Sequence, residues 1–228
     1  MKIVLLALFL LSAAWPAHAQ KRFNAGLKRE LDSLYTADQQ WRSLMFDPRL
    51  NRQPDSVAMA LGVKKANLPN FLALRMMRTD SANMVRVRAI IKQYGYPGKS
   101  LVGEPTNEAA WYIIQHSDDI KRYLPLIKTA AKRGELPFRL YAQMLDRQLM
   151  RDGKEQLYGT QAMGYRPLNP ATGERESLPP FVWPIKDEAK VNERRKQAGF
   201  STTVEQNAAV LGIKYRVVTM QEVARMPK

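Results

Sequence analysis

Downstream of residue 19 the sequence contains one histidine, His116, and the whole chain contains no cysteine. These two counts limit the chemistry that the chain can carry. A cysteine nucleophile, a disulfide framework, a Cys/His zinc site and a metal centre built from several histidines of one chain are all excluded. Any acid–base step that uses an imidazole must pass through His116.

His116 ends a run of apolar residues that is predicted to be a buried helix, and Asp118 follows two residues later. The helix end favours the protonated ring, whereas burial opposes it. A carboxylate beside an imidazole is what a general base requires, so Asp118 could orient the ring. The alternative is a structural histidine that caps its own helix and bonds to a backbone carbonyl. Both interpretations stay open at this point.

Asp146 and Arg147 form a second polar pair, within a predicted helix at residues 138–152. Arg147 falls at the edge of the apolar face of this helix, and Asp146 lies further round. An arginine at such an edge can bury its stem and direct its guanidinium into a polar site. The alternative is an ordinary, partly exposed pair.

The densest polar run outside the predicted helices begins at Gln156 and ends at Gln161. In a strand, Gln156, Tyr158 and Thr160 would share one face and could line a pocket, or that face could simply be solvated. Near the N-terminus, Asp38 and Arg42 stand four residues apart and can pair along a helix. The chain has no nucleophile elbow, no P-loop, no dinucleotide-binding fingerprint and no H-E-x-x-H sequence.

The elements that must position these residues are mostly helical. Apolar periodicity and capping residues predict helices at 27–44, 54–62, 69–78, 81–94, 106–116, 117–133 with a kink or break at Pro125, 138–152, 187–197 and 202–211. Residues 99–104 are expected to be a loop. A hairpin at about 156–178 would have strands near 165–168 and 175–178 around a turn at 169–174, and the tail at 214–220 could be a strand or loose. The predicted fold is mainly α (α+β), a compact multi-helix domain spanning residues 20–228 with one late β-hairpin.

Residues 1–19 have the pattern of a signal peptide. Lys2 precedes the apolar run Ile3 to Leu11, and Ala17-His18-Ala19 fits the cleavage pattern, so cleavage is expected between Ala19 and Gln20. The alternative is an uncleaved N-terminal anchor. No later stretch is apolar enough to span a membrane. The sequence therefore predicts an exported protein, periplasmic or secreted.

The chain is strongly basic, with 36 Lys and Arg against 21 Asp and Glu and a net charge of +15. Such a charge would suggest nucleic acid as the partner of a cytosolic protein. For an exported protein, anionic envelope surfaces fit better, and the chain lacks a basic motif interleaved with aromatic residues, so nucleic acid is not the favoured partner. Solvated helix faces are the simplest alternative.

Several short motifs follow one another in a recognisable order. They are Asp38-Gln-x-x-Arg42, Asp80-x-x-Asn83, Tyr94-Gly-Tyr-Pro-Gly98, Trp111-x-x-x-Gln-His-Ser-Asp118, Asp146-Arg147, Gln156-x-Tyr-Gly-Thr-Gln161 and Val191-x-x-Arg-Arg195. This order resembles the bacterial family called domain of unknown function 6624, over residues 27–211. One departure is Tyr96, where tryptophan is more usual. The resemblance implies no activity, but it singles out His116, Asp118, Asp146, Arg147, Gln156, Tyr158 and Gln161 as members of a shared pocket.

Three hypotheses follow. The first is a pocket that binds or turns over a small polar or anionic ligand by hydrolysis or transfer, with neither a metal nor another cofactor. Its catalytic residues would be His116, Asp118, Asp146 and Arg147, and its ligand-binding residues Gln156, Tyr158, Thr160, Gln161, Asp38 and Arg42. The second is a non-catalytic basic envelope protein that binds anionic polymers or a protein partner. The third is an exported, metal-independent nuclease-like effector.

Overall fold

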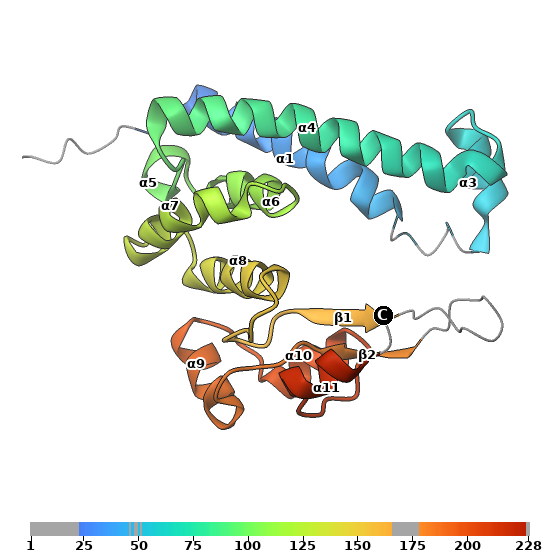
Figure 1. Cartoon of the computed structure of the whole chain (residues 1–228). Helices are drawn as coiled ribbons and strands as arrows, with labels where there is room; N and C mark the ends of the chain where they lie inside the picture. The colour runs from blue at the N-terminus through green and yellow to red at the C-terminus, as the bar shows by residue number, and fades with distance from the viewer. Residues whose placement is uncertain (1–22, 46, 48–49, 51, 166–177, 227–228) are drawn as a thin grey trace, which may run out of the picture.

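The computed structural model describes residues 23–45, 47, 50, 52–165 and 178–226 (Figure 1). The fold is mainly helical, with a two-stranded antiparallel sheet late in the chain, which confirms the predicted fold class. The expected signal peptide and the expected hairpin turn at 169–174 lie outside the described residues.

Two long helices, α1 (Ala25–Met45) and α4 (Leu68–Tyr94), run side by side and form one layer of the molecule (Figure 1). Leu31 of α1 and Val87 of α4 are fully buried in the main core. At one end of the layer, α3 (Pro54–Ala60) and the 3₁₀ turn Lys65–Asn67 pack around a smaller cluster that includes the buried Leu72.

The sequence predicted two helices, 69–78 and 81–94, where the structure has the single helix α4. The predicted break rested on Asp80 or Ser81 acting as an N-cap. In the structure the Asp80 carboxylate instead accepts two hydrogen bonds from Arg42 of α1. No glycine or proline follows Pro69 before Gly95, so nothing in the chain interrupts the helix.

The next segment places α6 (Ala109–Gln115) inside the protein. Residues 99–104, expected to be a loop, contain the short helix α5 (Lys99–Val102), and a 3₁₀ turn, Thr106–Glu108, leads into α6. Five of the seven residues of α6 are buried, as its uniformly apolar sequence predicted. Its Trp111 donates a hydrogen bond to the carbonyl of Leu140 at 2.8 Å, which fixes α6 against the following layer.

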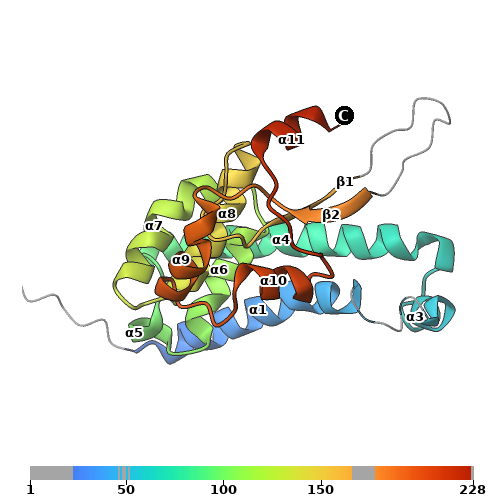
Figure 2. The same ribbon diagram turned by 90° about the horizontal axis from the view of Figure 1, so that it is seen from below.

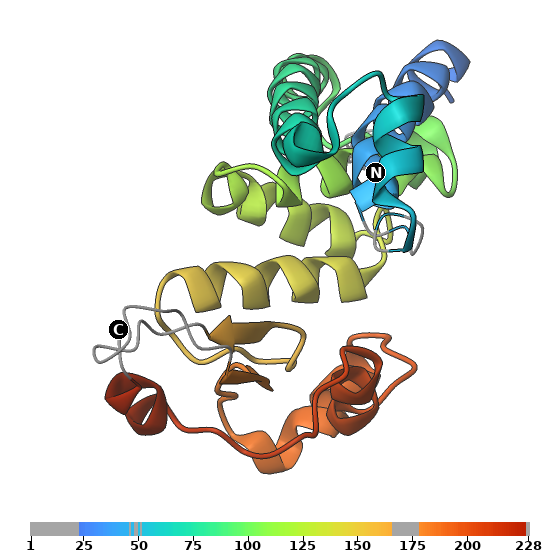
Figure 3. The same ribbon diagram turned by 90° about the vertical axis from the view of Figure 1, so that its right-hand side faces the viewer.

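The helix α7 (Ile120–Lys132) continues through Pro125 without a break, and α8 (Phe138–Arg151) follows it. Figure 3 shows α8 between the α1, α4, α6 and α7 part of the molecule and the C-terminal part. Residues of α8, which include Asp146 and Arg147, can therefore contact both the helices before α8 and the C-terminal part.

The C-terminal part contains the hairpin and several short helices (Figure 2). Strand β1 (Ala162–Tyr165) pairs with β2 (Leu178–Val182), with Ala162 opposite Val182. The described strands share residue 165 and residue 178 with the predicted strands at 165–168 and 175–178, whose other residues lie outside the described part of the chain. The structure adds 162–164 to the first strand and 179–182 to the second. The remaining elements are a 3₁₀ turn at Glu188–Lys190, α9 (Val191–Gln197), α10 (Val204–Val210) and α11 (Met220–Arg225).

One further expectation for this part was wrong. Residues 156–161 form an irregular loop with one isolated bridge, Gln156 to Ile185, rather than part of a strand. The tail was expected to be a strand or loose, and residues 214–219 have no regular secondary structure, whereas Met220 begins the helix α11. The N-cap Thr219 and Glu222 form a capping box at the start of this helix. Among the described helices, none is both long enough and apolar enough to cross a membrane.

Candidate functional site

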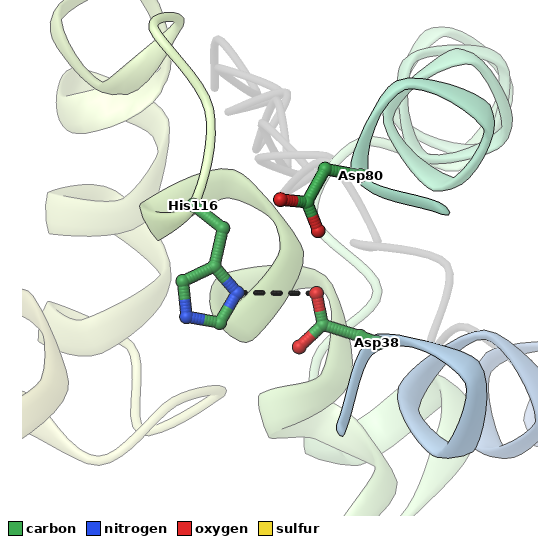
Figure 4. A group of neighbouring side chains, drawn as sticks. All are labelled: Asp38, Asp80 and His116. Atoms are coloured by element: carbon green, nitrogen blue, oxygen red, sulfur yellow. Dashed lines mark hydrogen bonds and ion pairs between the residues drawn. The ribbon is translucent and has the colours of Figure 1, made fainter. Parts of the chain in front are cut away.

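The ring of His116 contacts a carboxylate that lies 78 positions earlier in the chain. His116 is the C-cap residue directly after α6, and its Nδ1 lies 3.1 Å from Oδ1 of Asp38 in α1. Figure 4 shows Asp38, Asp80 and His116 pointing toward one another from three separate helices, with the second ring nitrogen directed away from both carboxylates. That nitrogen, Nε2, has no hydrogen-bond partner among the described residues.

Asp38 is held in place by more than the histidine. Its side chain is fully buried, and its carboxylate accepts hydrogen bonds from Gln39 Nε2 at 2.6 Å and Arg42 Nη1 at 3.1 Å. Arg42 also donates to the backbone carbonyl of Asp38 at 2.8 Å. The i,i+4 pairing predicted from the sequence is thus present. A buried carboxylate with three polar partners is fixed in orientation.

Arg42 connects this pair to α4. Its Nη2 donates to both carboxylate oxygens of Asp80, at 2.9 and 2.7 Å, while its Nη1 serves Asp38. The guanidinium therefore bridges two acidic side chains and locks α1 onto α4. The four groups form a chain of contacts that runs from Asp80 through Arg42 and Asp38 to His116.

The side chains of Asp38, Asp80 and His116 could provide ligands for a cation. One oxygen of Asp38, one of Asp80 and a ring nitrogen of His116 lie within 4.8 Å of one another. Carboxylate and imidazole ligands of this kind suit zinc and other divalent ions. Arg42 already neutralises both carboxylates, however, so a cation would have to displace the guanidinium.

Chemically, the arrangement suits an imidazole that works as an acid or base. A carboxylate that accepts the Nδ1 proton fixes the tautomer and leaves Nε2 as the working nitrogen. The His116 side chain is 17% exposed, so the ring is largely shielded yet still reaches solvent.

An open cavity of about 470 Å³ adjoins the end of α6. It lies between α6, α8 and the residues that lead into β1, and its wall contains Gln115 but not His116 itself. Its lining residues are Trp111, Tyr112, Gln115, Arg139, Leu140, Gln143, Arg147, Thr160, Gln161, Ala162 and Leu211. No aspartate or glutamate is among them, so the wall is cationic and rich in amides.

Arg147 joins this cavity to the histidine segment. Its Nη1 donates to the carbonyl of Gln115 at 3.1 Å, and its Nε lies 3.4 Å from Oε1 of Gln161. Burial lowers the pKa of Arg147, and the positive charge of Arg151 lowers it further. Of the predicted site residues, Arg147 therefore contacts Gln161 and also Gln115, the residue before His116.

Asp146 lies elsewhere. Its carboxylate is fully buried and accepts hydrogen bonds from the backbone N–H groups of Leu157, Tyr158 and Thr160 and from the hydroxyl of Thr160. Burial raises the pKa of Asp146, and these donors counteract the rise. The structure thus shows Asp146 anchoring the loop at 156–161. The sequence hypothesis had instead placed Asp146 beside His116.

The other polar residues of this loop have different surroundings. The Gln156 amide is fully buried and donates to the carbonyls of Gln161 and Trp183, while its oxygen accepts from the N–H of Gln161. The ring of Tyr158 packs near Phe200, and burial raises its pKa. Thr160 lines the cavity although its hydroxyl also bonds to Asp146.

Asp118, the other carboxylate suggested for His116, is exposed and has no hydrogen bond or ion pair among the described residues. Its neighbour Asp119 instead pairs with Arg88 of α4 at 2.6 Å. The ring of His116 therefore faces α1, and the nearest acidic partner comes from there.

Sequence reasoning left out Asp80, Gln39, Arg139, Gln143 and Arg195 as site or anchoring residues. Asp80 was noted in a motif but was interpreted as a helix cap, since its contact to Arg42 joins positions 38 residues apart. Arg195 is 1% exposed and donates to the carbonyl of Tyr158 at 2.8 Å, which gives the loop a second side-chain anchor besides Asp146. The doubled arginine of its motif was the one available signal.

Comparisons with known proteins place the chain in a family without assigning an activity. No curated protein and no solved structure matches the sequence. The sequence model of the family of unknown function DUF6624 matches residues 58–217, which includes Asp80, His116, Arg147 and the loop at 156–161, while Asp38 and Arg42 precede the matched region. Because the match covers more than half of the chain, the protein belongs to the family DUF6624.

Proposed function

We propose that the protein binds a small polar or anionic ligand in the cavity beside α6 and acts on it with His116 as a general acid–base. The observation that carries this proposal is the 3.1 Å contact between His116 Nδ1 and the buried Asp38 carboxylate, with Nε2 left without a partner among the described residues. A ring held in this way is prepared to exchange a proton at Nε2.

The surroundings of the ring support a site rather than a simple helix cap. A histidine that merely caps its own helix would bond to a nearby backbone carbonyl. The ring of His116 instead contacts the side chain of Asp38. Gln115, the residue before His116, lines the cavity, and Arg147 bonds to the carbonyl of Gln115, so the wall of the cavity adjoins the backbone of the histidine. Hydrolysis or group transfer fits one imidazole with fixed polar neighbours.

The proposal is tested with a panel of chromogenic substrates: 4-nitrophenyl acetate, 4-nitrophenyl phosphate and bis(4-nitrophenyl) phosphate. We expect one of them to be turned over and His116→Gln to reduce the rate by about 10²–10⁴-fold, the usual contribution of a general acid–base. Asp38→Asn should also reduce the rate, because Asp38 is the residue in contact with the ring. The fold reduction caused by Asp118→Asn should be at least ten times smaller than that caused by Asp38→Asn. Turnover that survives in His116→Gln would contradict the proposal.

The same assay separates the imidazole from metal chemistry. The panel is repeated with EDTA and with added Zn²⁺ or Mn²⁺. Because Arg42 already neutralises Asp38 and Asp80, we expect rates to change less than twofold. Strong activation by one metal would move the assignment to a metal site at Asp38, Asp80 and His116.

A non-catalytic role on anionic polymers is the second candidate, and the excess of 36 Lys and Arg over 21 Asp and Glu favours it. In that case heparin or anionic vesicles would bind with a strong dependence on salt, and His116→Gln would leave binding unchanged. A nuclease-like effector, the third candidate, would cleave an oligonucleotide with EDTA present and would lose that cleavage in His116→Gln.

We also propose that the protein is exported, on the strength of the sequence pattern of residues 1–19. The periplasm or the exterior of the cell would then be its place of action, where anionic envelope components are abundant.

A further inference from the structure

We infer that the cavity beside α6 binds the oxyanion head group, a carboxylate or phosphate, of a small organic molecule, with Arg147 as its principal contact. This inference deepens the proposed function because it names the class of ligand that the site takes. It rests on the charge balance of the cavity rather than on His116, so the two can fail separately.

Arg147 is a partly buried cation without an acidic partner. Its Nε and one hydrogen of Nη1 donate to uncharged oxygens, and Nη2 has no partner in the described part of the chain. Arg42, Arg86, Arg88, Arg139 and Arg216 each pair with a carboxylate. Burying a guanidinium without a counter-charge carries an unfavourable desolvation free energy. The attraction to a bound anion would offset that free energy.

The groups around Arg147 favour an anion as well. Arg139 lines the same cavity, and its partner Glu108, at 3.1 Å, is not part of the wall. Arg151 adds a further positive charge near Arg147. The adjacent acidic residue, Asp146, is occupied by the loop amides and cannot serve as the counter-ion.

The polar and apolar parts of the wall indicate an organic molecule with a charged end. The side-chain amides of Gln115 and Gln143 line the cavity and have no hydrogen-bond partner among the described residues, so they are available to a ligand. Leu140, Ala162 and Leu211 offer apolar surface in the same wall. A volume of about 470 Å³ falls within the range of small-molecule sites. A planar guanidinium edge matches carboxylate and phosphate equally, so both head groups are tested.

Three probes share one aromatic body and differ in the head group: 4-nitrobenzoate, 4-nitrophenyl phosphate and the neutral 4-nitrobenzamide. Binding to the folded protein is measured by calorimetry at about 0.15 M salt, where long-range surface attraction is screened. We expect at least one anionic probe to bind at least tenfold more tightly than the amide. Equal binding of all three, or no binding of either anion, would overturn the inference.

Variants identify the residue responsible. Arg147→Gln should weaken binding of the anionic probe at least tenfold. Arg147→Lys should weaken binding less, because lysine keeps the positive charge but lacks the planar, forked guanidinium. Arg86→Gln, which removes one charge from an exposed position of α4, is the matched control and should change affinity less than twofold. If Arg86→Gln weakens binding as much as Arg147→Gln, general surface charge is responsible and the inference fails.

His116→Gln separates this inference from the proposed function. We expect it to bind the anionic probe within twofold of the parent protein while losing turnover. Binding that depends on Arg147 together with turnover that does not depend on His116 would uphold the inference and contradict the proposed acid–base role. Circular dichroism of each variant confirms that it is folded before binding is measured, and Arg147→Lys keeps the test decisive if Arg147→Gln unfolds.

Discussion

At the scale of single residues, the two fully buried aspartates, Asp38 and Asp146, differ in the partners that they contact. Asp146 is surrounded by backbone N–H donors of one loop, whereas Asp38 meets the side chains of Gln39, Arg42 and His116. Backbone donors hold a conformation, and convergent side chains can act on a ligand. Asp146 therefore anchors the loop, and a functional role for Asp38 is our proposal.

Asp146→Asn should destabilise the protein by about 3 kcal/mol, because an amide cannot accept all the hydrogen bonds that the carboxylate accepts and a buried donor is left unpaired. The free energy of unfolding in urea measures this loss. Asp152→Asn on the same helix is the matched control, since its contact with Gln148 is an exposed i,i+4 pair, and it should change stability by less than about 0.5 kcal/mol. Equal effects of the two variants would show that the loop does not depend on Asp146.

The sequence could predict individual site residues better than their partners. The Asp38–Arg42 pair was predictable because both lie on one helix. The contact from Asp38 to His116 was not, since it depends on how α1 packs against the end of α6. Asp118 and Asp146 were chosen for their closeness in sequence or their motif, and the fold directs Asp118 to solvent and Asp146 to a loop.

At the scale of elements, the continuity of α4 brings Asp80 to Arg42. Had the helix ended at Arg78, as the sequence predicted, Asp80 would have capped a new helix and would have been unavailable to α1. Capping residues also occur inside helices, and there the tertiary contact decides their role. The buried helix α6 and the helix α8 were predicted within a few residues, because their apolar patterns and flanking glycine or proline are strong.

A proline placed at position 81 distinguishes the continuous helix from two helices. Within a helix, Ser81→Pro removes a hydrogen bond and clashes with the preceding turn, which costs about 3 kcal/mol or more. If a helix began at Asp80, the same proline would occupy its first position and would be tolerated. We expect a large loss of stability for Ser81→Pro and almost none for Ser81→Ala, both measured by thermal unfolding.

At the scale of the whole molecule, α8 joins the main core to the C-terminal part. Its buried Leu140 and Met144 belong to the main core, while Asp146 holds the loop that leads to the hairpin. One domain over residues 20–228 stays a prediction, and α8 is the element that would couple its parts. The hairpin itself was predicted, but the extension of β2 over residues 179–182 was not, because the prolines at 179 and 180 stand inside this strand.

One domain implies one cooperative unfolding transition. Trp111 reports on the main core, and Trp183 lies in a separate cluster of the C-terminal part. The indole N–H signals of both residues, followed by NMR through a urea titration, should disappear with the same midpoint. Midpoints that differ by more than the error of the titration would mean that the two parts unfold independently.

Export makes a further prediction for the whole chain. Protein isolated from cells that express the full sequence with its natural start should begin at Gln20 and should be recovered outside the cytoplasm. Intact-mass measurement of the purified protein decides this. A mass that retains residues 1–19 would contradict the proposed cleavage between Ala19 and Gln20.

The most direct test of the account is the protonation pattern of the one imidazole that remains when the protein starts at Gln20. In untagged protein labelled with ¹⁵N-histidine, at about pH 9 where an ordinary imidazole is neutral, long-range ¹H–¹⁵N correlation distinguishes the two ring nitrogens. Orientation by Asp38 requires a proton on Nδ1 and an unprotonated Nε2, and Asp38→Asn should shift this balance. A ring protonated on Nε2, and unchanged by Asp38→Asn, would contradict the central claim.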